Sequence, residues 1–83
     1  MGSTADTDEL VSFLVRSLVE HPDDVRVERR QAGEHSVVFE VTVHSDDVGK
    51  IIGRQGRMIK AIRTIVRAAA SLDDADASVE VIG

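Results

Sequence analysis

The chain has 83 residues and a net charge of −5, with 42% hydrophobic and 30% charged residues. This length allows one domain with one small core, and the composition is typical of a globular rather than a disordered protein. The absence of cysteine excludes disulfides, thiolate nucleophiles and Cys-based metal sites, and it favours a cytoplasmic location. The longest apolar runs are too short to span a membrane, and the first residues lack the pattern of a secretion signal.

At the N-terminus the pattern predicts a flexible tail over residues 1–6, followed by one domain over residues 7–83. A helix is expected from about Thr7, which can cap it together with the residue before. Its apolar residues recur at helical spacing: Leu10, Val11, Phe13, Leu14, Val15 and Leu18. Pro22 disfavours helix at the preceding position, so this helix should end near Val19 or the next residue.

Two segments then alternate between apolar and polar side chains, residues 25–28 and residues 37–44, which is typical of half-buried strands. The second segment has the strongest alternation in the chain. The turn between them, residues 31–35, contains Gly33, so the two strands are expected to pair as a hairpin.

Ser45 is expected to cap a short helix, with Asp46 and Asp47 near its positive end, and Gly53 should end it. A longer helix is predicted from about Arg57 to Ser71. Its apolar side chains fall within roughly 120° of arc: Met58, Ile59, Ile62, Ile65, Val66 and Ala69. Its basic side chains fall on the opposite arc: Arg57, Lys60, Arg63 and Arg67, of which the last two are expected on a solvated helix face.

An acidic loop over residues 72–76 and a strand over residues 78–82 complete the chain. The predicted order is therefore α-β-β-α-α-β, an α+β fold in which three helices cover one face of a three-stranded sheet. The crossover through two helices allows the third strand to run parallel to the second, with right-handed connection.

The charge is distributed unevenly. Residues 48–72 contain six basic and no acidic side chains, whereas the other 58 residues contain four basic and fifteen acidic ones. One contiguous segment thus carries +6 and the remainder −11, which keeps a nucleic-acid partner open despite the net negative charge.

Gly53-Arg54-Gln55-Gly56 lies between the two helices of this basic segment. Its glycines permit a sharp turn, and the helix that follows presents free amides at its positive end, so a phosphate is the expected ligand. A GxxG sequence alone is weak, because glycines between helices are commonly only turn residues. Three neighbouring features strengthen the prediction of a phosphate site: the apolar doublet before the motif, the isoleucine after it and the local positive charge.

The stretch from Ile51 to Ile59, IIGRQGRMI, resembles the IIGxxGxxI signature of the KH domain. The element order resembles the bacterial type II arrangement. The wider match, VGKIIGRQGR followed by KAIRT and AAA, is similar to the KhpA family of small stand-alone KH proteins of bacteria, over about residues 8 to 82.

This resemblance implies binding of about four nucleotides of single-stranded RNA or DNA. The residues implied to contact phosphates, or to add charge beside them, are Gly53, Arg54, Gln55, Gly56, Lys50, Arg57 and Lys60. The residues implied to line the groove for the bases are Val48, Ile52 and Ile59. The only aromatic residues, Phe13 and Phe39, lie in apolar stripes, so stacking on exposed rings is disfavoured.

The resemblance also implies a homodimer and a hetero-complex with KhpB, a larger KH-containing protein. Either the face of the second central helix or a sheet edge could dimerise.

No catalytic constellation, cofactor or metal site is predicted, because the three histidines are scattered without metal-ligand spacing and no acid, base and nucleophile converge. The leading interpretation is a non-catalytic, single-stranded RNA-binding protein, acting as an RNA chaperone or post-transcriptional regulator, with micromolar or weaker affinity per domain and no membrane partner. The alternative is an assembly module whose RNA binding depends on a partner protein, which the acidic loop 73–76 favours slightly. An enzyme acting on a phosphorylated small molecule is a third and weaker interpretation.

Overall fold

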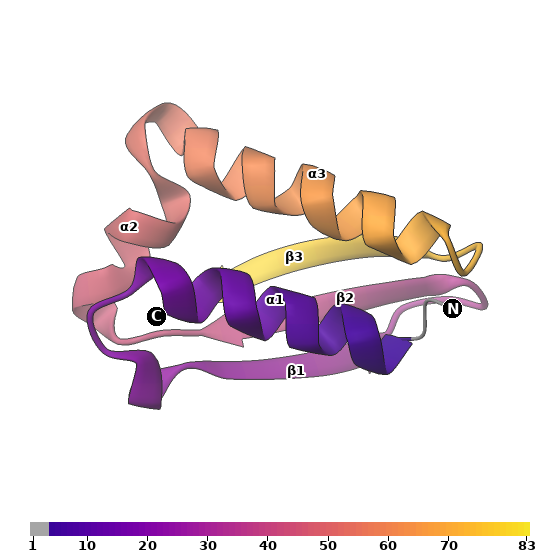
Figure 1. Ribbon diagram of the computed structural model, residues 1–83, viewed down its shortest axis with the longest axis horizontal. Coiled ribbons are helices and arrows are strands. Elements are labelled where there is room, and N and C mark those ends of the chain that lie inside the picture. Colours follow the sequence, from indigo (N-terminus) through magenta and orange to yellow (C-terminus); the bar gives the residue numbers. More distant parts are fainter. Residues whose placement is uncertain (1–3) are drawn as a thin grey trace.

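The computed structural model describes residues 4–83, and side chains are described from residue 7 onward. The helices and strands are α1 (Thr4–Leu18), β1 (Arg26–Gln31), β2 (Ser36–Thr42), α2 (Val48–Ile52), α3 (Arg57–Ser71) and β3 (Asp76–Ile82). Single turns of 3₁₀ helix lie at Pro22–Asp24, Ser45–Asp47 and Arg54–Gly56. Figure 1 shows this order along the chain, which confirms the predicted α-β-β-α-α-β arrangement.

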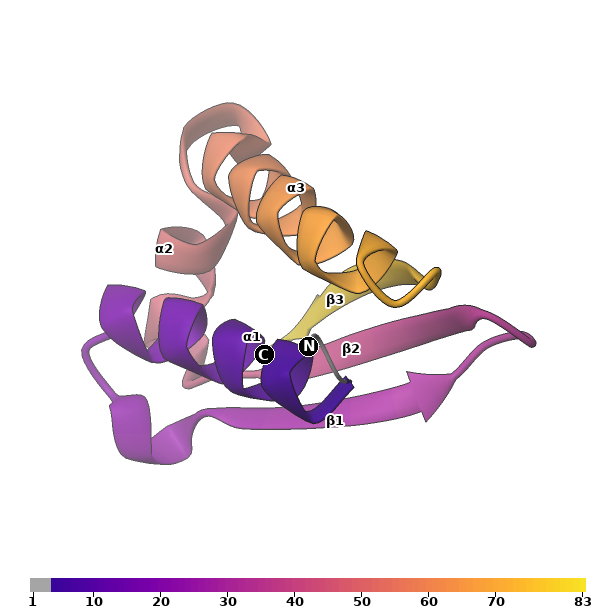
Figure 2. The same cartoon turned by 45° about the vertical axis from the view of Figure 1, so that its right-hand side comes forward.

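The sheet has the strand order β1-β2-β3, with β1 antiparallel and β3 parallel to the central strand β2. Phe39 of β2 lies opposite Arg29 on one side and Val79 on the other. Both the hairpin and the parallel third strand are therefore confirmed. The helices lie on one side of the sheet, which is clearest in Figure 2.

The core lies between the sheet and these helices. Alternate residues of β2 point into it, and Phe39 and Val41 are fully buried. α1 contributes Val11 and Val15, which are also fully buried. The residues that α3 contributes are Ile59, Ile62, Val66 and Ala70. A single core cluster thus connects all three strands to the helices above them.

α1 differs from the prediction at two points. It begins at Thr4, so residues 4–6 belong to a helix rather than to the expected tail, while residues 1–3 lie outside the described residues. Phe13, expected in the apolar stripe, is 69% exposed. The core-facing side of α1 is centred on Val11 and Val15. Phe13 lies two positions from each of them, so its side chain points about 160° away from both.

α3 has the predicted bounds but a different buried face. Ile65 was expected in the core and is 44% exposed, whereas Ala70 is buried. The buried arc is rotated by roughly 40° from the predicted one, because α3 packs on β3 at the side where Ala70 lies. Ile65 is consequently left at the margin of the buried face.

Within residues 4–83, we find no helix with the length and apolar character needed to cross a membrane.

Candidate nucleic-acid interface

The backbone of the GxxG loop adopts conformations that favour glycine. Gly53 has φ 75° and ψ 175°, a region that is essentially restricted to glycine. A Cβ on Gly53 would lie 2.6 Å from the Cβ of Met58. Gln55 and Gly56 also have positive φ, at 58° and 74°. The turn therefore requires glycine at position 53. At position 56 the left-handed backbone favours glycine, although an added Cβ would meet nothing within 4 Å.

This loop lies at the apex of the reversal between α2 and α3, at one end of the molecule (Figure 1). Arg54 and Gln55 at its tip are exposed. The N-cap of α3 is Gly56, and no side chain caps this 15-residue helix. The N–H of Arg57 donates to the carbonyl of Arg54, and the amides that follow lie at the positive end of the helix dipole, a position suited to an anion.

The basic residues of the segment 48–72 divide into two groups. Lys50 is ion-paired, with its Nζ 3.5 Å from Glu20 and 3.7 Å from Asp47. Among residues 7–83, whose side chains the structure describes, no carboxylate lies within ion-pair distance of the other five: Arg54, Arg57, Lys60, Arg63 and Arg67. The uncompensated positive charge therefore begins at the loop and continues along α3.

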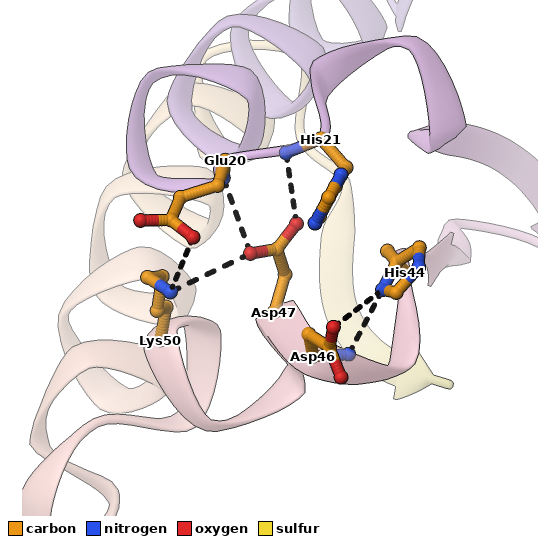
Figure 3. Close-up of polar contacts among 6 residues, drawn as sticks. All are labelled: Glu20, His21, His44, Asp46, Asp47 and Lys50. Atoms are coloured by element: carbon orange, nitrogen blue, oxygen red, sulfur yellow. Dashed lines mark hydrogen bonds and ion pairs between the residues drawn. The ribbon is translucent and has the colours of Figure 1, made fainter.

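Asp47 holds α2 against the end of α1, as Figure 3 shows. Its side chain is fully buried and accepts hydrogen bonds from the backbone N–H groups of Glu20, at 3.1 Å, and His21, at 3.0 Å. The sequence pattern indicates only a place for Asp47 near the positive end of a helix. It does not reveal this role, since the two partners of Asp47 lie 26 and 27 positions away. The interaction fixes the helix that leads into the GxxG loop.

Burial alone would raise the pKa of the Asp47 carboxyl. The two backbone N–H donors, together with the charges of His21 and Lys50, outweigh burial. The pKa of Asp47 therefore lies below its ordinary value of 3.8.

The cap of the first turn differs from the prediction. His44, not Ser45, is the N-cap, and its Nδ1 accepts the backbone N–H of Asp46 at 3.0 Å. The imidazole of His44 also stacks on that of His21, with ring centroids 4.1 Å apart. The two histidines, expected from the sequence to be scattered, are therefore brought together by the fold.

The stacked histidines lie near Asp24, and one ligand atom from each of the three residues falls within 4.8 Å of the others. Nδ1 of His44 is already occupied by the amide of Asp46, and the imidazole of His44 is stacked on that of His21. We therefore assign no metal to this cluster.

The apolar residues predicted to line a groove are placed differently from one another. Val48 and Ile52 of α2 are half-buried, and Val48 lies against Gly83 at the end of β3. Ile59 is only 5% exposed and belongs to the core. Of the three predicted groove residues, Val48 and Ile52 therefore remain partly accessible to solvent beside the loop, and Ile59 does not.

Arg63 was expected on a solvated helix face, and the structure contradicts this. It is half-buried, and its guanidinium donates two hydrogen bonds to the carbonyl of Val79 in β3. Arg67 is exposed, as expected. Lys60, Arg63 and Arg67 follow each other at spacings of three and four residues, so all three lie on the side of α3 next to β3.

The acidic loop 73–76 lies at the opposite end of α3 from the GxxG loop (Figure 1). α3 has 15 residues, which corresponds to about 22 Å of helix. A strand bound at the GxxG loop is therefore far from these carboxylates, and the Debye length of about 8 Å at physiological salt screens them further.

A GxxG loop between two helices, inserted after the second strand of an αββααβ fold, defines a type II KH domain. The family model described as the KH domain of KhpA/KhpB matches residues 8–81. This chain belongs to that family.

Several relatives carry the name RNA-binding protein KhpA. The protein from Clostridium perfringens is 47% identical over 74 residues, which cover 89% of this chain and 97% of the relative. The protein from Halalkalibacterium halodurans is 53% identical over 62 residues, covering 75% and 80%. That from Chlamydia pneumoniae is 39% identical over 74 residues, covering 89% and 94%.

Among solved structures, Era from Aquifex aeolicus bound to GDP·AlF4⁻ superposes with a TM-score of 0.64 at 22% identity. The match covers 92% of this chain and 30% of Era. A structure of Era with MgGDPNP and nucleotides 1506–1542 of 16S ribosomal RNA gives the same values. At this identity the similarity concerns the fold alone.

We expect Gly53→Ala to destabilise the domain by about 1–3 kcal/mol, because alanine is strained in this conformation and its Cβ would overlap Met58. Gly49→Ala is the matched control. It lies within α2 with nothing inside 4 Å of an added Cβ, so it should be neutral or stabilise by about 0.5–1 kcal/mol. Urea unfolding followed by circular dichroism measures both. Equal stabilities of the two variants would contradict the assignment of strain to Gly53.

We expect Asp47→Asn to lower the unfolding midpoint at pH 7, because an amide replaces one of the two oxygens that accept the Glu20 and His21 N–H groups. The pKa of Asp47 is lower in the folded protein than its ordinary value of 3.8. The stabilisation by Asp47 is therefore complete above pH 3.8 and is lost as the pH falls through the lower, native pKa. The difference between wild type and variant should therefore shrink below pH 3.8. The exposed Asp46→Asn variant is the control, and a midpoint for Asp47→Asn equal to that of wild type at pH 7 would refute the role.

Proposed function

We propose that this protein binds single-stranded RNA through the GxxG loop and the adjoining groove. The observation that carries the proposal is the loop itself: exposed Arg54 and Gln55 stand before the uncapped N-terminus of α3, and unpaired basic side chains continue from there. The relatives named RNA-binding protein KhpA support RNA as the ligand.

In this proposal the phosphates of about four nucleotides lie on the loop, contacted by the amides after Arg57 and by Arg54, Gln55 and Arg57. The bases lie toward Val48 and Ile52, between α2 and the end of β3. Lys60 adds charge beside the path. Lys50 contributes less, because Glu20 and Asp47 already neutralise it.

We further propose that the protein acts by binding alone, as an RNA chaperone or post-transcriptional regulator rather than as an enzyme. Four nucleotides per domain offer limited sequence information, which suits broad recognition of many RNAs. A single domain with few phosphate contacts should bind with micromolar or weaker affinity.

We expect fluorescence anisotropy with labelled single-stranded RNA across a salt series to give a log–log slope of roughly −1.4 to −2.8, for two to four neutralised phosphates. The double variant Arg54→Asp/Gln55→Asp should abolish binding, because it puts negative charge where the phosphates lie. Glu34→Asp/His35→Asp is the control, since it changes an exposed hairpin turn.

Equal binding by the loop variant and by wild type would reject the loop as the RNA site. The alternative function would then be favoured, in which the protein is an assembly module whose RNA binding depends on a partner protein. A complex in which RNA binding appears only with the partner present would identify that case.

The homodimer is proposed to form through the exposed face of α3 rather than through the edge of β3. Residues at spacings of four, three and four form an apolar stripe on this face: Ala61, Ile65, Ala68 and Leu72. All four are exposed, with Leu72 at 78%, and this spacing is that of helix–helix packing. Arg63 covers a carbonyl of β3, which disfavours pairing there.

This apolar stripe is about 140° around α3 from the Lys60–Arg63–Arg67 side. Dimerisation through it leaves both basic sides free, so two domains can bind one RNA with raised effective concentration. We extend the proposal to a hetero-complex with KhpB, whose KH domain is described by the same family model.

We expect Ile65→Glu to convert the dimer to a monomer, because it places a charge in the centre of the apolar stripe. RNA affinity for oligonucleotides long enough for two domains should fall at least tenfold through lost avidity. Sedimentation velocity measures the oligomeric state. Phe13→Glu, which changes another exposed apolar residue, should leave it unchanged, and a dimer that survives Ile65→Glu would exclude this interface.

A further inference from the structure

The carbonyl of Val79 faces the open edge of the sheet. The backbone N–H of Val43 donates to Ile82, and that of Asp76 donates to His35 beside the start of β2. Even-numbered residues of β3 thus direct their peptide groups toward β2. Because successive residues of a strand in a parallel pair alternate in this direction, the carbonyl of Val79 points away from β2. Among the described side chains, Arg63 alone donates hydrogen bonds to this carbonyl at the open edge.

Arg63 uses one side of its guanidinium for this contact. Nε donates to the carbonyl oxygen of Val79 at 3.4 Å, and Nη2 donates to the same oxygen at 3.3 Å. The other end of the guanidinium carries a pair of parallel donors on Nη1 and Nη2. Among residues 7–83, the part of the chain whose side chains are described, that end has no acceptor and no carboxylate partner. A planar group is thus held by one edge while its second edge stays available.

This available edge lies beside the proposed RNA path. Arg63 is seven residues after Gly56, about 10 Å along the helix from the loop, and it shares a side of α3 with Lys60. The held end places it between α3 and the open edge of β3, where the proposed groove continues. A strand that starts on the GxxG loop and follows the open edge of β3 comes within reach of Arg63.

We infer that Arg63 recognises one base of the bound strand, through two hydrogen bonds from its free end. Such a pair of donors fits a base with two adjacent acceptor atoms. Guanine offers O6 and N7, and cytosine offers O2 and N3, whereas adenine and uracil place a donor next to each comparable acceptor. Arg63 is accordingly a specificity-determining residue for guanine or cytosine at one position. The inference rests on the proposed function.

The contact with Val79 is what makes this recognition selective. A free arginine adapts to phosphates and bases alike, but a guanidinium held in one plane presents its donors in a fixed direction. Lysine at the same position would keep the charge and lose the planar pair of donors. Charge and base recognition can therefore be separated by substitution.

The test uses the full chain and labelled octauridines in which one central base is uridine, adenosine, guanosine or cytidine. We expect the guanosine or the cytidine oligonucleotide to bind at least about fivefold more tightly than the adenosine and uridine ones. Preference for guanosine alone assigns O6 and N7 as the acceptors, and preference for cytidine alone assigns O2 and N3.

Arg63→Lys should reduce this preference to less than twofold while leaving the affinity for octauridine and the salt slope unchanged. Arg67→Lys is the matched control, because Arg67 lies one turn further on the same side of α3 and is exposed. It should keep the full preference. A preference retained by Arg63→Lys, or lost equally in Arg67→Lys, would overturn the inference.

A second measurement does not depend on the variant folding. The ¹⁵N-detected Nε–H signal of Arg63 should shift on addition of the preferred oligonucleotide and not of the adenosine one. Binding that is abolished by Arg54→Asp/Gln55→Asp but equal for all four bases rejects the role of Arg63 and leaves the proposed function standing. Binding that the loop substitutions do not affect rejects both.

Discussion

The chain reverses at Gly53 in a conformation that only glycine adopts comfortably, and the helical half of the domain depends on this reversal. It ends α2, directs the first amides of α3 outward, and brings α3 back across the sheet to β3. The contact between Gly53 and Met58 is so close that no side chain fits between them. The same residue therefore determines both the shape of the candidate phosphate site and the path of the helix behind it.

Charge is arranged around this reversal by tertiary contacts as much as by sequence. Asp47 and Glu20 neutralise Lys50 on the side of the loop where α2 meets α1. Along α3 the positive charge is left uncompensated, while the carboxylates of residues 73–76 lie at the far end of that helix (Figure 1). A protein with a net charge of −5 can in this way present a local surface suited to a phosphodiester backbone.

Periodic segments were predicted well, because their apolar spacing alone determines which element forms. The strand alternation around Phe39 and the helical spacing from Arg57 to Ser71 are examples. β1 extends to Gln31, beyond the alternating residues, because pairing with β2 imposes extended backbone on a polar segment. The rotation of α3, which exposes Ile65, depends on where β3 packs, and helical spacing does not contain that information.

The sequence by itself determined the element order, the glycine turn and the contiguous basic segment, since each depends on neighbours within a few positions. Only the tertiary structure decided which side chains are buried, paired or exposed at the candidate interface. It occupied Lys50 with acidic partners, buried Ile59 and Asp47, and brought Arg63 to the carbonyl of Val79, 16 positions away. These outcomes depend on contacts between segments far apart in the chain, and such contacts are set by packing rather than by local pattern.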